Sequence, residues 1–112
     1  MGKASRDKGK RGERELASKL RGYGYDAHRG VQYKGGADSP DVTGLPGIHI
    51  EVKRTERLAL YDALAQSISD SGDGEMPVVI HRRNDCEWVV IQPLDDWIEL
   101  YRSYETEKEQ TQ

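Results

Sequence analysis

Apolar residues recur along the chain with two different spacings, and these spacings divide it into helices and strands. Between residues 10 and 23, apolar side chains fall three or four positions apart, which predicts an amphipathic helix that ends at Gly22 and Gly24. The same spacing recurs at residues 58–69 and 93–104. Apolar and β-branched runs predict strands at residues 25–29, 41–45, 48–53, 77–83 and 87–92.

The order of these elements predicts the class of fold. Residues 41–45 and 48–53 flank the turn pair Pro46-Gly47, so these two strands should form a β-hairpin. The order α-β-ββ-α-ββ-α indicates an α/β protein with a central mixed β-sheet flanked by helices. Polar ends complete the expected layout, which consists of a mobile basic leader (1–9), a single domain (10–104) and a disordered acidic tail (105–112).

Composition narrows the class of protein further. The chain has 112 residues, of which 35% are hydrophobic and 33% charged, so we expect one domain with a small core. The single cysteine, Cys86, excludes an internal disulfide and a cysteine-based zinc cluster, and it indicates a cytoplasmic location. No apolar run approaches the roughly 20 residues of a membrane span, and the N-terminus does not resemble a secretory signal.

Charge is distributed unevenly along the chain. The net charge is −3, yet residues 1–21 hold eight Lys and Arg against three acids. A basic start on an acidic protein favours contact with phosphates, whereas the alternative is a solvated, flexible leader.

Charged side chains lie inside the strand at residues 48–53, where a core-building strand has little use for them. Because side chains alternate along a strand, Glu51 and Lys53 point to the same face as His49. In the hairpin, Asp41 comes opposite this region. Two carboxylates held close together repel each other unless a cation lies between them. Their oxygens suit Mg²⁺ or Mn²⁺, and such a site hydrolyses phosphodiesters, with the lysine orienting the attacking water.

A surface ion pair is the alternative explanation for Glu51 and Lys53, because such pairs are common on strands and contribute little. The Pro40-Asp41 pair, across a tight turn, favours the metal site instead. Other catalytic patterns are absent from the sequence, which has neither a P-loop nor a GxSxG signature. His28 and His49 have no histidine partner at a metal-ligand spacing, which argues against zinc.

Pro40-Asp41 followed by Glu51-Val52-Lys53 resembles the motif of the PD-(D/E)xK nuclease superfamily, whose fold is restriction-endonuclease-like. The segment RGERELASKLRGYGYDAHR is similar to the first helix and strand of archaeal-type Holliday junction resolvases and their phage relatives. The resemblance implies a metal-dependent DNA endonuclease that acts on branched DNA, in phage recombination or DNA processing. A homodimer is expected, since paired symmetric cuts need two sites.

The resemblance also implies roles for individual residues. Asp41 and Glu51 would be the principal metal ligands, assisted by the backbone carbonyl of Val52, and Lys53 would be the catalytic lysine. Glu13 matches the helix glutamate of the resolvases and would complete the acidic patch directly or through water; the alternative is a first-turn acid that favours the helix dipole.

The helix after the Glu51-Val52-Lys53 strand carries a further candidate. Gln66 is similar in position to a polar residue that several branches of the superfamily, including VRR-type nuclease domains, place near the metal. Its alternative is an exposed polar side chain of a helix.

The residues expected to contact DNA are basic and flank the site in the sequence: Lys10, Arg11, Arg14, Arg29, Lys34 and Arg54. Each of them, taken singly, could equally be a solvated side chain.

Four interpretations of the function follow. The favoured one is a Mg²⁺- or Mn²⁺-dependent endonuclease for four-way junctions, and a second is a flap, nick or structure-nonselective nuclease of the same fold. A third is a module that binds DNA without cutting it, and a fourth is a structural or packaging protein. Metal-dependent cleavage separates the first two interpretations from the others.

Overall fold

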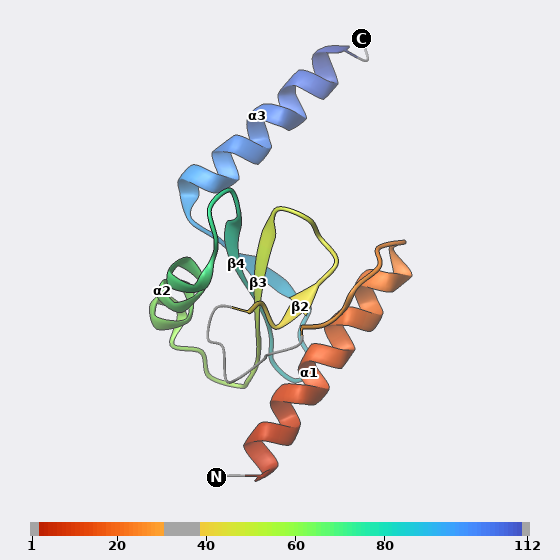
Figure 1. The fold of residues 1–112 in the computed structure, drawn as a ribbon, viewed down its shortest axis with the longest axis vertical. Coiled ribbons are helices and arrows are strands. Elements are labelled where there is room, and N and C mark those ends of the chain that lie inside the picture. The colour runs from red at the N-terminus through yellow and green to blue at the C-terminus, as the bar shows by residue number, and fades with distance from the viewer. Residues whose placement is uncertain (1–2, 31–38, 111–112) are drawn as a thin grey trace.

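The computed structural model of the chain describes residues 3–30 and 39–110. The helices and strands follow the predicted order (Figure 1). They are α1 (Lys3–Gly22), β1 (His28–Arg29), β2 (Val42–Thr43), β3 (Ile48–Arg54), α2 (Leu60–Asp70), β4 (Met76–Arg82), β5 (Val89–Ile91) and α3 (Leu94–Gln110).

Five strands form one mixed sheet in the order β1-β2-β3-β4-β5. The strands β3 and β4 run parallel and are joined through α2, whereas the other neighbouring strands pair antiparallel. The predicted hairpin of β2 and β3 is confirmed, and Val42 pairs with Ile50. This register places Asp41 beside Glu51, as the sequence predicted.

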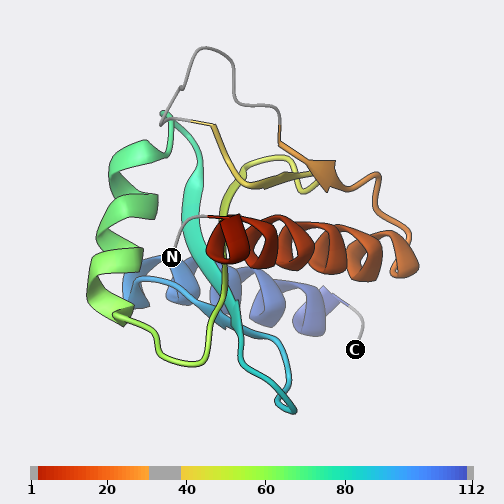
Figure 2. The same cartoon turned by 90° about the horizontal axis from the view of Figure 1, so that it is seen from below.

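The main hydrophobic core lies between α1 and the sheet (Figure 2). Leu16, Ala17 and Leu20 project from α1 at helical spacing, and all three are buried. They pack against alternate residues of the central strands and their neighbours, which are Ala27, Val42, Ile50, Val52, Val78 and Ile80. The helix therefore covers the even-numbered side chains of β3.

The opposite face of the sheet is covered by α2. Ser67 of this helix is fully buried, and its hydroxyl donates to the carbonyl of Val78 at 3.0 Å and reaches that of His49 at 3.5 Å. Two further side chains of this face, His49 and Glu51, are 0% and 5% exposed. Both faces of β3 are thus enclosed, and its polar side chains lie inside the protein.

Some details of the helices differ from the prediction. Tyr23 was expected on the buried stripe of the first helix, but it lies beyond the end of α1 and is 66% exposed. On α2, Ile68 is exposed, whereas its neighbour Ser67 is buried. The polar Ser67 fits there because two strand carbonyls accept its hydroxyl, a partner that helical periodicity alone does not reveal.

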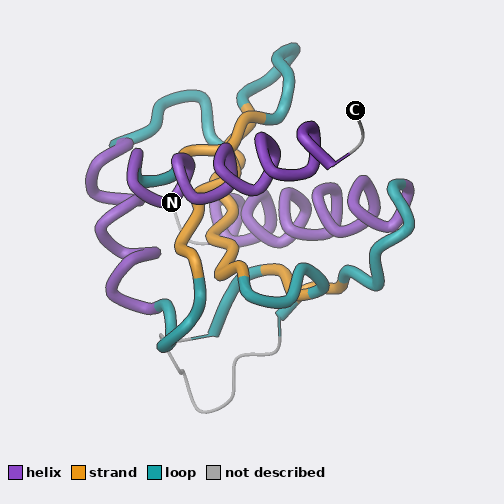
Figure 3. Tube along the Cα trace, turned by 90° about the horizontal axis from the view of Figure 1, so that it is seen from above, coloured by secondary structure: helices purple, strands orange, loops and turns teal. Residues whose placement is uncertain are grey.

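The third helix leaves the sheet at one end and extends away along the long axis of the molecule (Figures 1 and 3). None of its residues is buried. It continues to Gln110, well into the segment expected to be a disordered tail, and α1 begins at Lys3, within the expected leader. The domain boundaries at residues 10 and 104 stay a prediction.

No helix in the described part of the chain is long and apolar enough to cross a membrane.

The turn between β2 and β3 requires glycine at Gly44. Its φ is +121°, and an added Cβ would lie 2.6 Å from the Cα of Ala27 and 2.7 Å from the carbonyl oxygen of Asp26. The hairpin therefore packs directly on the backbone that precedes β1. Gly47 also has a positive φ, of +89°, but a Cβ added to it would meet no atom within 4 Å.

We predict that Gly44→Ala destabilises the fold by about 3 kcal/mol or more, because it adds a backbone clash to the strain of a positive φ. Gly47→Ala is the matched control, since it carries the strain alone and should cost about 1–2 kcal/mol. Urea unfolding of both variants measures the difference. Equal losses of stability would show that the packing of Gly44 on Ala27 contributes nothing.

Candidate active site

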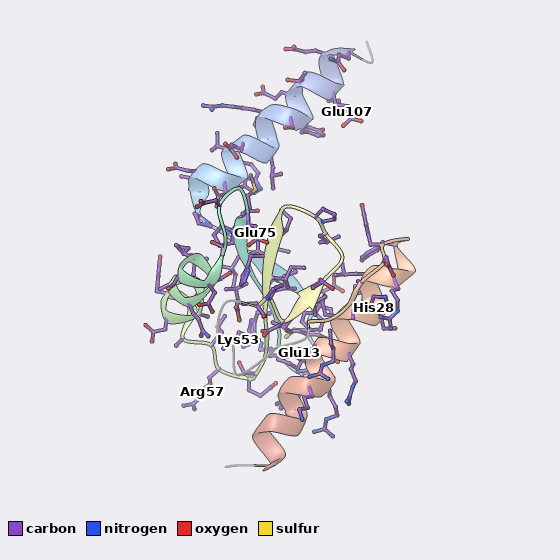
Figure 4. All side chains as sticks on the ribbon, in the orientation of Figure 1. Glu13, His28, Lys53, Arg57, Glu75 and Glu107 are labelled. Atoms are coloured by element: carbon purple, nitrogen blue, oxygen red, sulfur yellow. The ribbon has the colours of Figure 1, made fainter. Side chains whose placement is uncertain are left out.

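Three elements and the residue before β2 bring the predicted catalytic residues to one cleft of about 500 Å³. Glu13 comes from α1, Glu51 and Lys53 come from β3, and Gln66 comes from α2, while Asp41 immediately precedes β2. Figure 4 shows Glu13 and Lys53 near each other at the lower end of the sheet. The structure thus gathers residues that lie up to fifty-three positions apart in the sequence.

Asp41 is fixed on both its backbone and its side chain. Its N–H donates to the carbonyl of Ile50 at 2.8 Å, which extends the ladder between β2 and β3 by one residue. Its Oδ2 accepts the backbone N–H of Val52, also at 2.8 Å. The carboxylate is therefore locked against β3, next to the side chain of Glu51.

The electrostatics of this pair are unfavourable for two negative charges. Burial raises the pKa of Asp41 to about 6, and the neighbouring Glu51 adds to the rise, although the hydrogen bond from Val52 and the charge of Lys53 oppose it. Burial also raises the pKa of Glu51, while its hydrogen bond with Asp41 opposes that shift. Burial is the largest cause of both rises, and the two carboxyls also hydrogen-bond to each other.

Glu13 lies at the edge of the acidic patch and is tied to a basic residue. Its Oε1 accepts a hydrogen bond from Nε of Arg29 at 2.9 Å. Burial raises the pKa of Glu13, and this hydrogen bond opposes the rise. The three carboxyls of Glu13, Asp41 and Glu51 do not bring one oxygen each within 4.8 Å of one another. This spacing favours a contribution of Glu13 through water.

Close packing sets the distance of α1 from the cleft. A Cβ added to Gly12 would lie 2.4 Å from Cβ of Arg54, the last residue of β3. The helix therefore approaches the strand at the residue next to Glu13, and the buried Gly12 permits this approach.

Arg54 was expected to contact DNA, but its side chain is only 14% exposed and is held within the protein. It lies 3.6 Å from Oε2 of Glu15 and donates to Oδ1 of Asn84 at 3.0 Å. Glu15 also forms an ion pair with Arg82. Glu15 therefore joins α1 to the ends of β3 and β4.

The other expected DNA-contacting residues fall into three groups. Lys10, Arg11 and Arg14 are exposed on α1. Arg29 is partly buried and is paired with Glu13. Lys34 lies outside the described residues.

Two further polar residues adjoin the site, and sequence reasoning did not assign them to it. His49 Nε2 lies 3.1 Å from Oε1 of Glu51, and Asp70, at the end of α2, completes a trio whose ligand atoms lie within 4.8 Å of one another. The alternation of β3 placed His49 on the face of Glu51. Nothing in the sequence placed Asp70 there, because only the packing of α2 on β3 brings it close.

The donor set of the cleft fits a divalent metal ion. Asp41 and Glu51 offer hard carboxylate oxygens, and burial raises the pKa of both, so a bound cation would offset the cost of ionising them together. Partly buried carboxylates and a lysine beside a mixed sheet of this topology are typical of nucleases of the PD-(D/E)xK class.

Comparison with known proteins identifies the family. The sequence profile described as archaeal Holliday junction resolvase (Hjc) matches residues 4–111, so the chain belongs to this family. The solved structure of Hjc from Archaeoglobus fulgidus, a Holliday junction resolvase from an archaeal hyperthermophile, is similar to it with a TM-score of 0.57. The two chains are 28% identical over 76% of this chain and 72% of the other. No curated protein sequence matches.

Several predictions from the sequence are thereby confirmed. The fold is the α/β, restriction-endonuclease-like fold of Hjc, with a five-stranded mixed sheet and three helices in the residues that the structure describes. The function is that of a Holliday junction resolvase, which is a metal-dependent endonuclease. The comparisons give no support for the phage origin that the sequence suggested.

We predict that Asp41→Asn stabilises the metal-free protein at pH 7.5 by about 1–3 kcal/mol, since one pKa unit corresponds to about 1.4 kcal/mol. The folded pKa of about 6 exceeds the ordinary 3.8, so protonated Asp41 favours folding. That contribution is complete below pH 3.8 and is lost as the pH rises through 6. The gain from the substitution should therefore shrink toward pH 4.

Urea unfolding at pH 4 and pH 7.5, with a chelator present, measures this gain. Asp73→Asn is the control, because Asp73 is an exposed carboxylate in the loop after α2. A gain from Asp41→Asn that does not change with pH would contradict the assignment.

Proposed function

We propose that this chain cuts four-way DNA junctions by hydrolysing phosphodiester bonds in the cleft lined by Glu13, Asp41, Glu51, Lys53 and Gln66. The convergence of these residues from separate elements is the observation that carries the proposal. Membership of the Hjc family supports a Holliday junction as the substrate.

In the proposed reaction, a water oxygen forms a bond to phosphorus and the bond from phosphorus to one sugar oxygen breaks. Lys53 lies on β3 two residues beyond Glu51, on the same side of the strand, so its ammonium group faces the acidic patch. There it donates hydrogen bonds to the attacking water or to the phosphoryl oxygens, on which negative charge develops. Gln66 lines the same cleft from α2 and orients the phosphate through its amide.

The carboxylates of Asp41 and Glu51 would hold the metal ion, with the carbonyl of Val52 as a third ligand and Glu13 acting through water. A bound Mg²⁺ or Mn²⁺ supplies a Lewis acid that polarises the phosphoryl oxygen and lowers the pKa of a coordinated water. Between the two, Mg²⁺ suits the all-oxygen donor set better.

DNA would approach over the basic residues around the cleft. Lys8 lines the cleft itself, and Arg57 is exposed on the loop after β3 (Figure 4). The exposed Lys10, Arg11 and Arg14 extend this basic surface along α1, and Lys34 is proposed as a further contact.

A DNA substrate and a single cysteine support the expected cytoplasmic location.

We predict that wild-type protein with Mg²⁺ cuts a labelled four-way junction and leaves a linear duplex of the same sequence intact. Lys53→Ala should lower the cleavage rate by about 100-fold or more, because it removes a donor that acts on the reacting atoms. It should still bind the junction in Ca²⁺. Lys19→Ala is the control, since Lys19 lies near the far end of α1, with its ammonium 5.7 Å from the Tyr23 ring centroid.

Each other outcome changes a definite part of the proposal. Equal cutting of junction and duplex would keep the site but replace the substrate by plain duplex, and flap and nicked DNA would then be compared. Junction binding without metal-dependent cutting would indicate a binding module. Full activity of Lys53→Ala would remove the lysine from the mechanism.

A homodimer is the second part of the proposal, and α3 is the surface that supports it. Trp97 and Tyr101 stack with their ring centroids 5.5 Å apart, and Tyr104 follows at 5.9 Å from Tyr101. These rings are 42–53% exposed, beside Leu94 and Leu100. Such a contiguous apolar stripe on a protruding helix is typical of an interface between subunits. A second copy would bring the second active site that paired cuts need.

We predict that the wild-type protein has twice the 12.7 kDa mass of one chain in light scattering and that Trp97→Asp lowers the mass to that of one chain. A buried carboxylate in the stripe would cost more than the apolar contact that it replaces. Tyr61→Asp, at an isolated exposed tyrosine of α2, should leave the dimer intact. A single-chain mass for wild-type protein with junction DNA bound would exclude the dimer.

A further inference from the structure

A second group of metal-ligating side chains lies behind the catalytic cleft, between β3 and α2. It consists of His49, Glu51 and Asp70, and one ligand atom from each lies within 4.8 Å of the other two. His49 is completely buried, Glu51 is 5% exposed, and Asp70 closes the group at the end of α2. The catalytic mechanism uses only Glu51 of these three.

The hydrogen bonds of this group are incomplete. In the described part of the chain, three buried side-chain atoms lack a hydrogen-bond partner, and one of them, Oδ2 of Asp70, belongs to this group. A second, Nδ1 of His49, lies on the far side of the imidazole ring, toward Glu75. Burying a polar atom without a partner costs free energy, so native proteins rarely leave one unsatisfied. A bound cation would give the Asp70 carboxylate a partner and would offset its repulsion of Glu51.

We propose that His49, Glu51 and Asp70 bind a divalent transition-metal ion, with Glu51 shared between this site and the catalytic one. The ligand nitrogen is Nε2 of His49, because it faces Glu51 at 3.1 Å. That separation suits two neighbouring ligands of one metal ion as well as it suits a hydrogen bond.

Glu75 supplies the outer partner that a metal-binding histidine needs. Its Oε1 lies 3.7 Å from Nδ1 of His49, on the other side of the ring from Glu51. The same oxygen accepts the backbone N–H of Gly72 at 2.6 Å, which anchors it in the loop before β4. A small closure of this gap would let Nδ1–H donate to Glu75, fix the tautomer of His49 and leave Nε2 free for the metal.

The donor set determines which metal fits. One imidazole and two carboxylates suit Mn²⁺ or Zn²⁺, whereas Mg²⁺ prefers oxygen ligands alone. The site therefore differs in selectivity from the carboxylate pair of the cleft, although the two share Glu51. In a protein with Mn²⁺, both sites should fill, and with Mg²⁺ only the catalytic one should.

The first experiment counts bound Mn²⁺ per chain by equilibrium dialysis, without DNA. Wild-type protein should bind two ions, and Asp70→Asn and His49→Gln should each bind one. Asp62→Asn is the matched control, because Asp62 is an exposed acid in the first turn of the same helix. Glu75→Gln should keep two ions but weaken one of them by about 10- to 100-fold, as expected for an outer partner.

Asp41→Asn separates this site from the catalytic one. It should remove the ion of the cleft and leave the ion on His49, so its Mn²⁺ count should also be one. A count of one for Asp41→Asn together with an unchanged count for Asp70→Asn would retain the catalytic site and overturn the second site. The reverse pattern would overturn the catalytic assignment alone.

A readout on His49 itself covers the case in which the buried His49→Gln variant does not fold. In Asp41→Asn protein, added Zn²⁺ should shift the ¹⁵N resonance of Nε2 in one histidine far more than in the other two. Asp70→Asn introduced into the same protein should reduce that shift, because it removes one of the three proposed ligands. This variant should still fold, since Asp70 lies at a helix end and the replacement is isosteric. Equal responses of all three histidines would overturn the proposal.

Discussion

The strand β3 is enclosed on both faces, and this constraint governs the rest of the molecule. The helix α1 covers its apolar side chains, and α2 covers the side that carries His49 and Glu51. A strand in this position cannot leave polar groups to water, so each of them needs a partner within the protein. His49 and Glu51 hydrogen-bond to each other, and Asp41 and helix α2 add the polar groups that gather beside them.

The same enclosure makes it costly to leave two ionised carboxylates beside each other without a cation. Asp41 is held against β3 by the N–H of Val52, so it cannot turn away from Glu51 when both are ionised. Burial, with a smaller contribution from Glu51, raises the pKa of Asp41, so ionising both carboxyls in this small volume costs free energy. A metal ion that binds there relieves a cost already present in the folded protein. The two carboxylates whose ionisation lowers the stability of the fold are thus the same groups that are proposed to bind the metal ion.

The sequence predicted correctly those features that depend on the spacing of residues within one strand or one turn. Alternation along β3 placed Glu51 and Lys53 on one face, and the short turn at Pro46-Gly47 set the hairpin that brings Asp41 opposite them. Partners that come from packing between distant elements were out of reach. Asp70 adjoins Glu51 only because α2 crosses from β3 to β4, and no periodicity encodes that contact.

Two of the basic residues expected to contact DNA also have partners within the protein. Arg54 is held by Glu15 and Asn84, and Arg29 is held by Glu13. Their contact with DNA stays a prediction. A basic residue next to an acidic cluster has two possible partners, phosphate and carboxylate. The sequence does not say which is nearer, because the acids in question lie on α1, far along the chain.

The apolar residues of α3 were ambiguous for a similar reason. An amphipathic stripe packs equally well within a chain or between two chains.

Gly12 shows how a residue without any functional group can determine the shape of an active site. It touches Arg54 of β3 so closely that a methyl group in its place would overlap the arginine side chain. Because Gly12 has no side chain, α1 lies close to β3, and this short distance determines where the neighbouring Glu13 lies in the cleft. A larger residue at position 12 would press against Arg54 and so change the spacing between α1 and β3 without altering any group that performs chemistry.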